Sequence, residues 1–177
     1  MSSILKVDTI QNTGGTTGLT IDSSGAILKP VLPSFSAYRA GAESRTYSAG
    51  ANISAEMTQT HHNDGGHYKT SGTDVGKFVA PFDGLYFFSI SIYKNGAGDK
   101  RVYVIIDNNT FTNSEGTLNT DKIVNSQGRV NSDGDNFEGS GIVKLSAGAK
   151  AYVSCSYDST VIFQHKSHSN FQGYLIG

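Results

Sequence analysis

The sequence predicts an all-β protein, in which an antiparallel β-sandwich or jelly roll follows a short extended segment. Beyond residue 33, short runs of alternating apolar and polar residues are separated by Gly, Asn, Ser and Thr at intervals of roughly ten residues. No window shows the period of an amphipathic helix. Short strands with turn signals at this spacing are typical of β-sandwiches and jelly rolls.

Aromatic residues divide the chain into two parts. Residues 1–29 contain none, whereas residues 34–177 contain all nine tyrosines and all nine phenylalanines. The change falls at the KPVLP stretch of residues 29–33, where two prolines interrupt regular structure. We therefore expect an amino-terminal segment over residues 1–32 and one globular domain over residues 33–177, which is long enough to bury a core.

The amino-terminal segment contains a weak repeat. LKVD at residues 5–8 returns as LTID at residues 19–22, and a cluster of Thr, Ser, Asn and Gly follows each copy. The pattern predicts two short strand-and-turn units. Their few apolar residues cannot offset the entropy of ordering the segment alone, so it is either a disordered terminus or a segment that orders against a partner. The repeat favours a docking or fibre segment, because stacked or intertwined copies bury the faces of such small units.

The globular part offers eight candidate strands, each bounded by turn residues. They are residues 34–40, 66–70, 76–80, 84–93, 101–107, 139–145, 151–157 and 170–176. The stretch KFVAPFDGLYFFSISIY, residues 77–93, is the most apolar and has large side chains on both faces of the expected strand. One face is predicted to fill the space between two sheets and comprises Tyr86, Phe88, Ile90 and Ile92. The other face, with Leu85, Phe87 and Tyr93, is predicted to meet neighbouring chains, although a bulge would reverse the assignment.

Charge and composition exclude several classes of function. With 14 basic and 15 acidic residues and a net charge of −1, the chain predicts no nucleic-acid-binding surface and no basic membrane-binding surface. The first residues lack the pattern of a signal peptide, and no apolar stretch of about 18 residues predicts membrane insertion. The single cysteine, Cys155, excludes an internal disulfide and is predicted to be a buried small side chain.

No motif predicts catalysis, so we expect a protein that is not an enzyme and has no cofactor. SGTDVGK at residues 71–77 resembles a phosphate-binding loop but is one residue too short between its glycines. Paired carboxylates for sugar cleavage could come from several aspartates, but the sequence brings no two together. Calcium ligands around Asp133 and Asp135 lack the rest of a calcium loop, and an exposed turn is the favoured interpretation.

Histidines form two groups without the spacing of a metal site. The first holds His61, His62 and His67, and the second holds His165 and His168. We predict no metal within one chain. If three chains meet on an axis, one histidine from each could still supply a three-nitrogen site, and this alternative stays open.

Residues 33–177 resemble the globular head of complement C1q and its relatives in the tumour necrosis factor superfamily. The densest shared motif comprises Phe78, Pro81, Gly84, Tyr86 and Phe88. Further matches follow in order along the chain: Phe35, Ala37, Tyr38, Asn63, Tyr68, Gly148, Phe171, Gly173, Tyr174 and Leu175. Ala149 departs from the family, which usually places an acidic residue there. The resemblance implies a ten-stranded jelly roll that forms a homotrimer, and we predict an interface that includes Phe35, Leu85, Phe87, Tyr93 and Tyr174.

The amino-terminal segment resembles the start of tail-fibre and appendage proteins of tailed bacteriophages. This resemblance implies a virion protein, in the tail or baseplate region, that assembles in the host cytoplasm and is attached to other virion proteins by its leader. The candidate attachment residues are Leu5, Val7, Ile10, Leu19 and Ile21.

The head is then expected to contact a bacterial surface glycan or protein. The candidate binding loop spans residues 113–136, a segment rich in Asn, Ser, Gly and Asp that could equally be a solvated connection. Its candidate residues are Asn113, Glu115, Asn119, Asp121, Asn131, Asp133 and Asp135. Three alternatives remain: a purely structural or decorative virion protein, a bacterial C1q-like recognition module unrelated to phage, and a polysaccharide-degrading enzyme.

Overall fold

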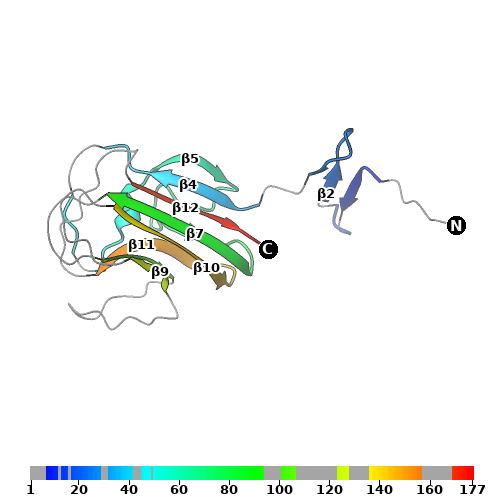
Figure 1. Cartoon of the computed structure of the whole chain (residues 1–177). Helices are drawn as coiled ribbons and strands as arrows, with labels where there is room; N and C mark the ends of the chain where they lie inside the picture. The colour runs from blue at the N-terminus through cyan, green and yellow to red at the C-terminus, as the bar shows by residue number, and fades with distance from the viewer. Residues whose placement is uncertain are drawn as a thin grey trace. The chain divides into compact units, whose positions relative to one another are not determined.

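A computed structural model describes ten stretches of the chain. They are residues 7–11, 13–15, 17–28, 32–41, 45–48, 50–93, 101–106, 123–127, 136–156 and 169–177. The regular secondary structure of these residues consists of β-strands and one 3-10 helix, η1, at Ile53–Glu56. The chain divides into two compact units, Met1–Leu32 and Pro33–Gly177 (Figure 1). None of the described helical structure is long and apolar enough to cross a membrane.

The first unit contains a small antiparallel sheet in the order β1-β2-β3. Its strands are β1 (Thr9–Gln11), β2 (Thr17–Ile21) and β3 (Ile27–Leu28). The second LTID copy overlaps β2, but the first strand begins at Thr9, immediately after the first copy rather than within it. The position of β1 is set by its pairing with β2, in which Ile10 lies opposite Leu19.

Asp22 closes the turn between β2 and β3. Its Oδ1 atom accepts hydrogen bonds from the Oγ and backbone N of Ser24, at 2.6 and 2.8 Å, and from the backbone N of Ala26 at 2.9 Å. The bond from the Ser24 hydroxyl is the main cause of the lowered pKa of this carboxyl group. Gly25 follows with φ of 84°, a conformation that favours glycine.

The second unit is a sandwich of two antiparallel sheets. The five-stranded sheet has the order β10-β7-β12-β4-β5, and the four-stranded sheet has the order β6-β11-β8-β9. The strands are β4 (Ser34–Tyr38), β5 (Gln59–Asp64), β6 (Phe78–Val79), β7 (Gly84–Tyr93), β8 (Arg101–Ile106), β9 (Ile123–Gln127), β10 (Asn136–Leu145), β11 (Lys150–Ser156) and β12 (Ser169–Leu175). The predicted all-β jelly roll is confirmed.

Three segments differ from the sequence-based expectation. No strand forms over residues 66–70, where Gly65 and Gly66 adopt positive φ values in a turn and Tyr68 makes a single bridge to Phe78. The paired strand is β5, whose polar sequence QTHHND carries no apolar alternation. The segment expected to be a loop over residues 113–136 contains β9, which pairs with β8.

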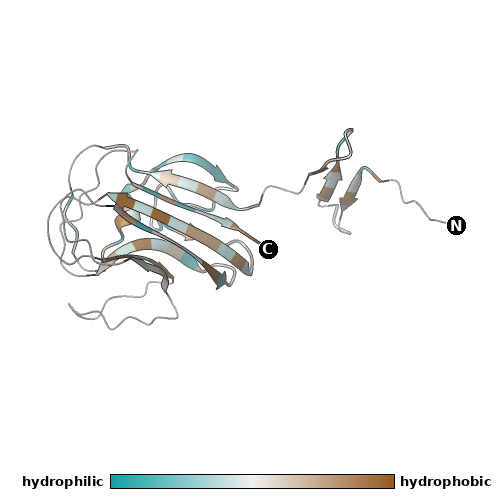
Figure 2. Ribbon diagram, in the orientation of Figure 1, coloured by the Kyte–Doolittle hydropathy of each residue, from teal (hydrophilic) through white to brown (hydrophobic). Residues whose placement is uncertain are grey.

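The core confirms the predicted face of β7. Figure 2 shows apolar and more polar residues alternating along this strand. The four buried side chains on its inner face, each at most 1% exposed, are Tyr86, Phe88, Ile90 and Ile92. Phe35 is also buried, with its ring centroid 4.6 Å from that of Tyr68 and 4.8 Å from that of Phe171. The prediction that Phe35 lies in a trimer interface is therefore wrong, because β4 turns Phe35 and Ala37 towards the core of its own chain.

The buried side chains of Tyr68 and Cys155 contact backbone carbonyl oxygens of the same chain. The Tyr68 hydroxyl donates to the carbonyl oxygens of Ser54 and Met57, at 3.1 and 3.0 Å, and burial raises its pKa. Cys155 is buried as predicted, and its Sγ lies 3.4 Å from the Ser48 carbonyl oxygen. Packing and local hydrogen bonds thus hold the sandwich without a disulfide.

Candidate functional site on the five-stranded sheet

The outer face of the five-stranded sheet carries side chains sorted into rows. Successive residues of a strand point to opposite faces, and directly paired residues of neighbouring strands point to the same face. The register of β10, β7 and β12 therefore aligns three outer residues at a time. We call Ile142, Phe87 and Tyr174 the apolar row. The two polar rows are Ser140, Ser89 and Gln172, and Glu138, Ser91 and Asn170.

The apolar row is open to solvent in the single chain. Ile142 is 62% exposed and Tyr174 is 48% exposed. The Phe87 and Tyr174 ring centroids are 5.2 Å apart with an interplanar angle of 35°. Leu85 extends the patch along β7, and Ile176 lies beside it, since its backbone N donates to the Leu85 carbonyl at 2.7 Å. Contiguous exposed apolar patches are characteristic of contact sites for proteins, membranes or ligands.

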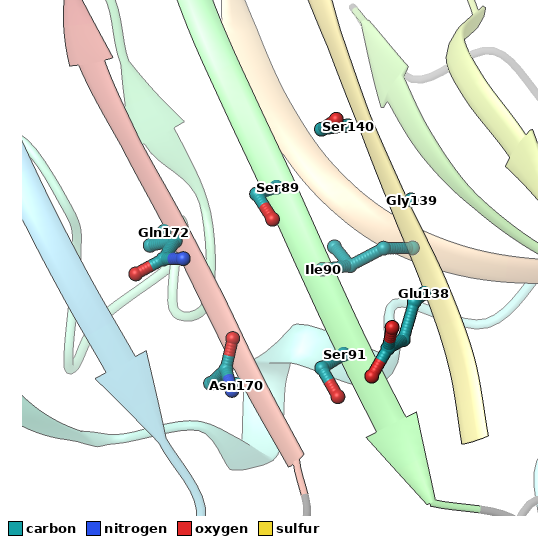
Figure 3. A pocket seen from close by; sticks show the side chains of 8 residues that line it. All are labelled: Ser89, Ile90, Ser91, Glu138, Gly139, Ser140, Asn170 and Gln172. Carbon is teal, nitrogen blue, oxygen red and sulfur yellow. The ribbon is translucent and has the colours of Figure 1, made fainter.

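The polar rows line a shallow hollow of about 700 Å³. Figure 3 shows it over three strands, with Ser89 and Ser91 on β7, Asn170 and Gln172 on β12, and Glu138 and Ser140 on β10. The hollow lies where β7 ends and where β10 and β12 begin. It therefore adjoins the carboxyl end of the candidate binding loop, which leads into β10 at Asn136.

These side chains can bind through hydrogen bonds. Three hydroxyls, two carboxamides and the Glu138 carboxylate supply both donors and acceptors. The lining contains no histidine or cysteine that could activate a serine as a nucleophile. Among the residues that the structure describes, no three His, Cys, Asp or Glu side chains gather as metal ligands. The hollow is thus suited to a hydroxyl-rich or amide-rich ligand.

Residues 35–176 match the family model of the C1q domain. The chain belongs to the C1q domain family. The globular domain of a zebrafish complement 1qA protein is similar in structure, with a TM-score of 0.53 and 15% identity over 82% of this chain and 98% of that one. Murine APRIL is similar with a TM-score of 0.55 and 9% identity, over 81% of this chain and 98% of that one. No protein with a curated description matches the sequence.

The C1q domain brings several of the predicted interface residues to one face. Leu85, Phe87 and Tyr174 lie on the outer face of the five-stranded sheet, and Tyr93, half-buried, ends the same side of β7. The role of these residues in a trimer stays a prediction. Ile142 was missed, because its outward direction depends on how β10 pairs with β7.

Other predicted residues lie elsewhere or outside the described stretches. The loop candidates Asn113, Glu115, Asn119, Asp121, Asn131, Asp133 and Asp135 all fall outside, as do Leu5, His165 and His168. Val7, Ile10, Leu19 and Ile21 belong to the first unit.

Two of the three described histidines contact different aromatic rings of the C1q domain. His61 stacks on Tyr38, with ring centroids 4.5 Å apart. His67 approaches the edge of Phe78 at 6.4 Å, and burial, with a smaller effect of Lys69, lowers its pKa. Together with the described acidic residues, these histidines form no group that could hold a metal ion.

Proposed function

We propose that this protein is a homotrimeric virion protein of a tailed bacteriophage that displays its C1q domain to the bacterial surface. C1q domains are binding modules that are often trimeric. The observation that supports association is the exposed apolar row on the five-stranded sheet. Residues 1–32 form the leader that attaches the trimer to other virion proteins in the tail or baseplate region.

Covering the apolar row supplies the energy of association. Burial of one large apolar side chain contributes on the order of 1.5–3 kcal/mol. Ile142, Tyr174 and Leu85 are each 46–62% exposed in the single chain, so a large share of this energy is available to a neighbouring chain. Three copies related by a rotation axis would use the same pair of complementary surfaces three times and close the ring.

We assign recognition of the bacterial surface to the polar rows, which lie beyond the apolar row on the same face of the five-stranded sheet. The polar rows present hydroxyl, amide and carboxylate groups that match the hydroxyls of a surface glycan or the backbone of a surface protein. The candidate binding loop ends at Asn136, where β10 begins, two residues before Glu138. Three weak sites in one trimer would bind a repetitive cell surface with an avidity that one site lacks.

The test measures binding of the labelled full chain to a panel of bacterial strains at several salt concentrations. We expect saturable binding to the host strain and a several-fold loss in the double variant Asn170→Ala, Gln172→Ala. Thr73→Ala, in an exposed turn outside the sheet, is the matched control. Binding to no strain at any salt concentration would support the alternative of a structural or decorative virion protein.

A second measurement separates the phage assignment from a bacterial recognition module. A chain that lacks residues 1–32 is produced during infection and its incorporation into purified particles is measured. We expect an intact trimer that is absent from particles, whereas the full chain is present. Equal incorporation of both chains would contradict the role of the leader in attachment.

A further inference from the structure

The leader sheet has one aliphatic face. Ile10 pairs with Leu19, and Ile21 pairs with Ile27, while Leu19 and Ile21 are two positions apart on β2. Paired residues and residues two apart point to the same side of a sheet. The four side chains therefore form one surface, which we call the leader face. The opposite side holds Thr9 and Thr20.

Nothing in the described part of the first unit covers the leader face. Ile10 is 51% exposed and Ile27 is 62% exposed, and Leu19 and Ile21 are half-buried. No residue whose burial is described between 7 and 27 is buried. Two or three short strands with one uncovered apolar face are marginal in water. The sheet therefore needs another surface against this face to be stable.

We propose that the leader faces of three copies of this chain cover one another and form a common aliphatic core. This inference rests on the proposed trimer of C1q domains. Ile10, Leu19, Ile21 and Ile27 would point inward in each copy, and the threonines would point outward. In this arrangement these residues would not contact other virion proteins directly. They would instead assemble the three leaders into the structure that binds those proteins.

The short connection between the two units favours copies of the same chain, rather than a different protein, as the surface that covers the leader face. Only residues 29–33 separate the end of β3 from the start of β4. A connection of this length spans at most roughly 20 Å. Three leaders joined to one trimer are thus held at an effective concentration in the millimolar range, far above that of a free partner.

The side chains of the leader face are also suited to contact with the leader faces of other copies. Its four residues are uncharged and aliphatic, so three copies can meet without repulsion between like charges. Twelve such side chains would be removed from water together. An interface with a separate protein needs complementary polar groups at its rim for specificity, and the four residues of this face supply none.

The experiment uses cysteine cross-linking in the full chain. Leu19→Cys places a thiol on the leader face, and Thr20→Cys, the matched control, places one on the opposite side of the same strand. Both native side chains are half-buried, and the natural Cys155 is 0% exposed and serves as an unreactive background. A short bis-maleimide reagent is added, and the fraction of chains in covalent dimers is measured on a denaturing gel.

We expect Leu19→Cys to approach a ceiling of about two thirds of the chains in dimers, since three thiols around one axis form one linked pair. Thr20→Cys should give a dimer fraction several-fold lower. Light scattering on each variant establishes the number of associated chains. A three-chain mass with equal cross-linking at both positions, or with none, overturns the leader core and leaves the trimeric head standing. A one-chain mass overturns both.

Hydrogen exchange provides an independent readout of the same core. Backbone amides of residues 17–21 should exchange slowly in the full chain and much faster in Leu19→Asn, because the substitution puts an amide group into the aliphatic core. Thr20→Asn should leave the exchange rates unchanged. Rapid exchange in the unmodified trimer would contradict the inference, and would indicate that the face awaits a different virion protein.

Discussion

Phe87 and Tyr174 are paired across β7 and β12, and their ring centroids lie 5.2 Å apart on the outer face of the C1q domain. Ile142 pairs with Phe87 from the other side. An aspartate at residue 142 would put a charge beside these rings, where a neighbouring chain could not solvate it. We expect Ile142→Asp to dissociate the trimer at micromolar concentration, so that light scattering reports the 18.8 kDa of one chain.

The control for this prediction is Ser71→Asp, which adds the same charge in an exposed turn outside the sheet. It should keep the mass of three chains. If Ile142→Asp also keeps that mass, the apolar row is not the trimer interface, and the proposed mode of association fails.

Gly173 is expected to tolerate no side chain. A Cβ atom there would lie 2.5 Å from Cδ1 of Phe88 and 2.9 Å from the carbonyl oxygen of Phe87. The Phe88 ring is 0% exposed and cannot move without displacing its neighbours. Gly173→Ala should lower the free energy of unfolding by about 1–3 kcal/mol in urea denaturation. Gly177→Ala, with open space around its Cβ, should behave like the unmodified protein.

Asn63 holds the turn that precedes β6. Its side-chain amide donates to the carbonyl oxygen of Tyr68 at 2.8 Å, and its Oδ1 accepts from the backbone N of Tyr68 at 3.1 Å. Asn63→Ala leaves both backbone groups without this partner, and we expect a loss of about 1–3 kcal/mol in the free energy of unfolding. His62→Ala, at the exposed neighbouring position, should change it by less than about 0.5 kcal/mol. Equal effects of the two substitutions would contradict this role of Asn63.

The buried Tyr68 is expected to make the free energy of unfolding of the C1q domain decrease at alkaline pH. Burial raises its pKa in the folded state above the ordinary value near 10, so above that pH only the unfolded chain loses the proton. Stability is then present below about pH 10 and falls by about 1.4 kcal/mol per pH unit above it for each such tyrosine. Burial also raises the pKa of Tyr47, Tyr86 and Tyr152, which steepens the fall.

We expect Tyr68→Phe to remove the contribution of one tyrosine, about 1.4 kcal/mol per pH unit, from this slope. The measurement is a series of denaturation curves between pH 9 and 11 at a fixed protein concentration. At neutral pH the same variant should lose about 1–3 kcal/mol, because the carbonyl oxygens of Ser54 and Met57 lose their shared donor. An unchanged slope would show that the Tyr68 hydroxyl is accessible to solvent in the folded protein.

The sequence predicted those parts of the fold that depend on local alternation. The inner face of β7 was predicted from its residues, since Tyr86, Phe88, Ile90 and Ile92 continue one apolar face to the end of the strand, whereas the other face changes to Ser89 and Ser91. The error at Phe35 has a physical cause, because the resemblance identified the strand but not its inner side. That side is set by pairing, which puts Phe35 opposite Gly173 of β12.

The candidate site could be predicted only in part, because it depends on register. Ile142 is separated by more than fifty residues from Phe87, and no local pattern fixes which of the two sides of β10 faces outward. The strand β5 was missed for a related reason. Its polar residues form a strand because β4 supplies hydrogen-bond partners, and not because of their own preference.

The backbone N of Leu175 donates to the carbonyl oxygen of Pro33 at 3.0 Å, which places the two ends of the C1q domain side by side. Its first and last strands, β4 and β12, are neighbours in one sheet. A single genetic exchange near codon 33 therefore transfers both sheets together, with their pairing intact. For the virion protein proposed above, such an exchange would replace the whole head and leave the leader unchanged.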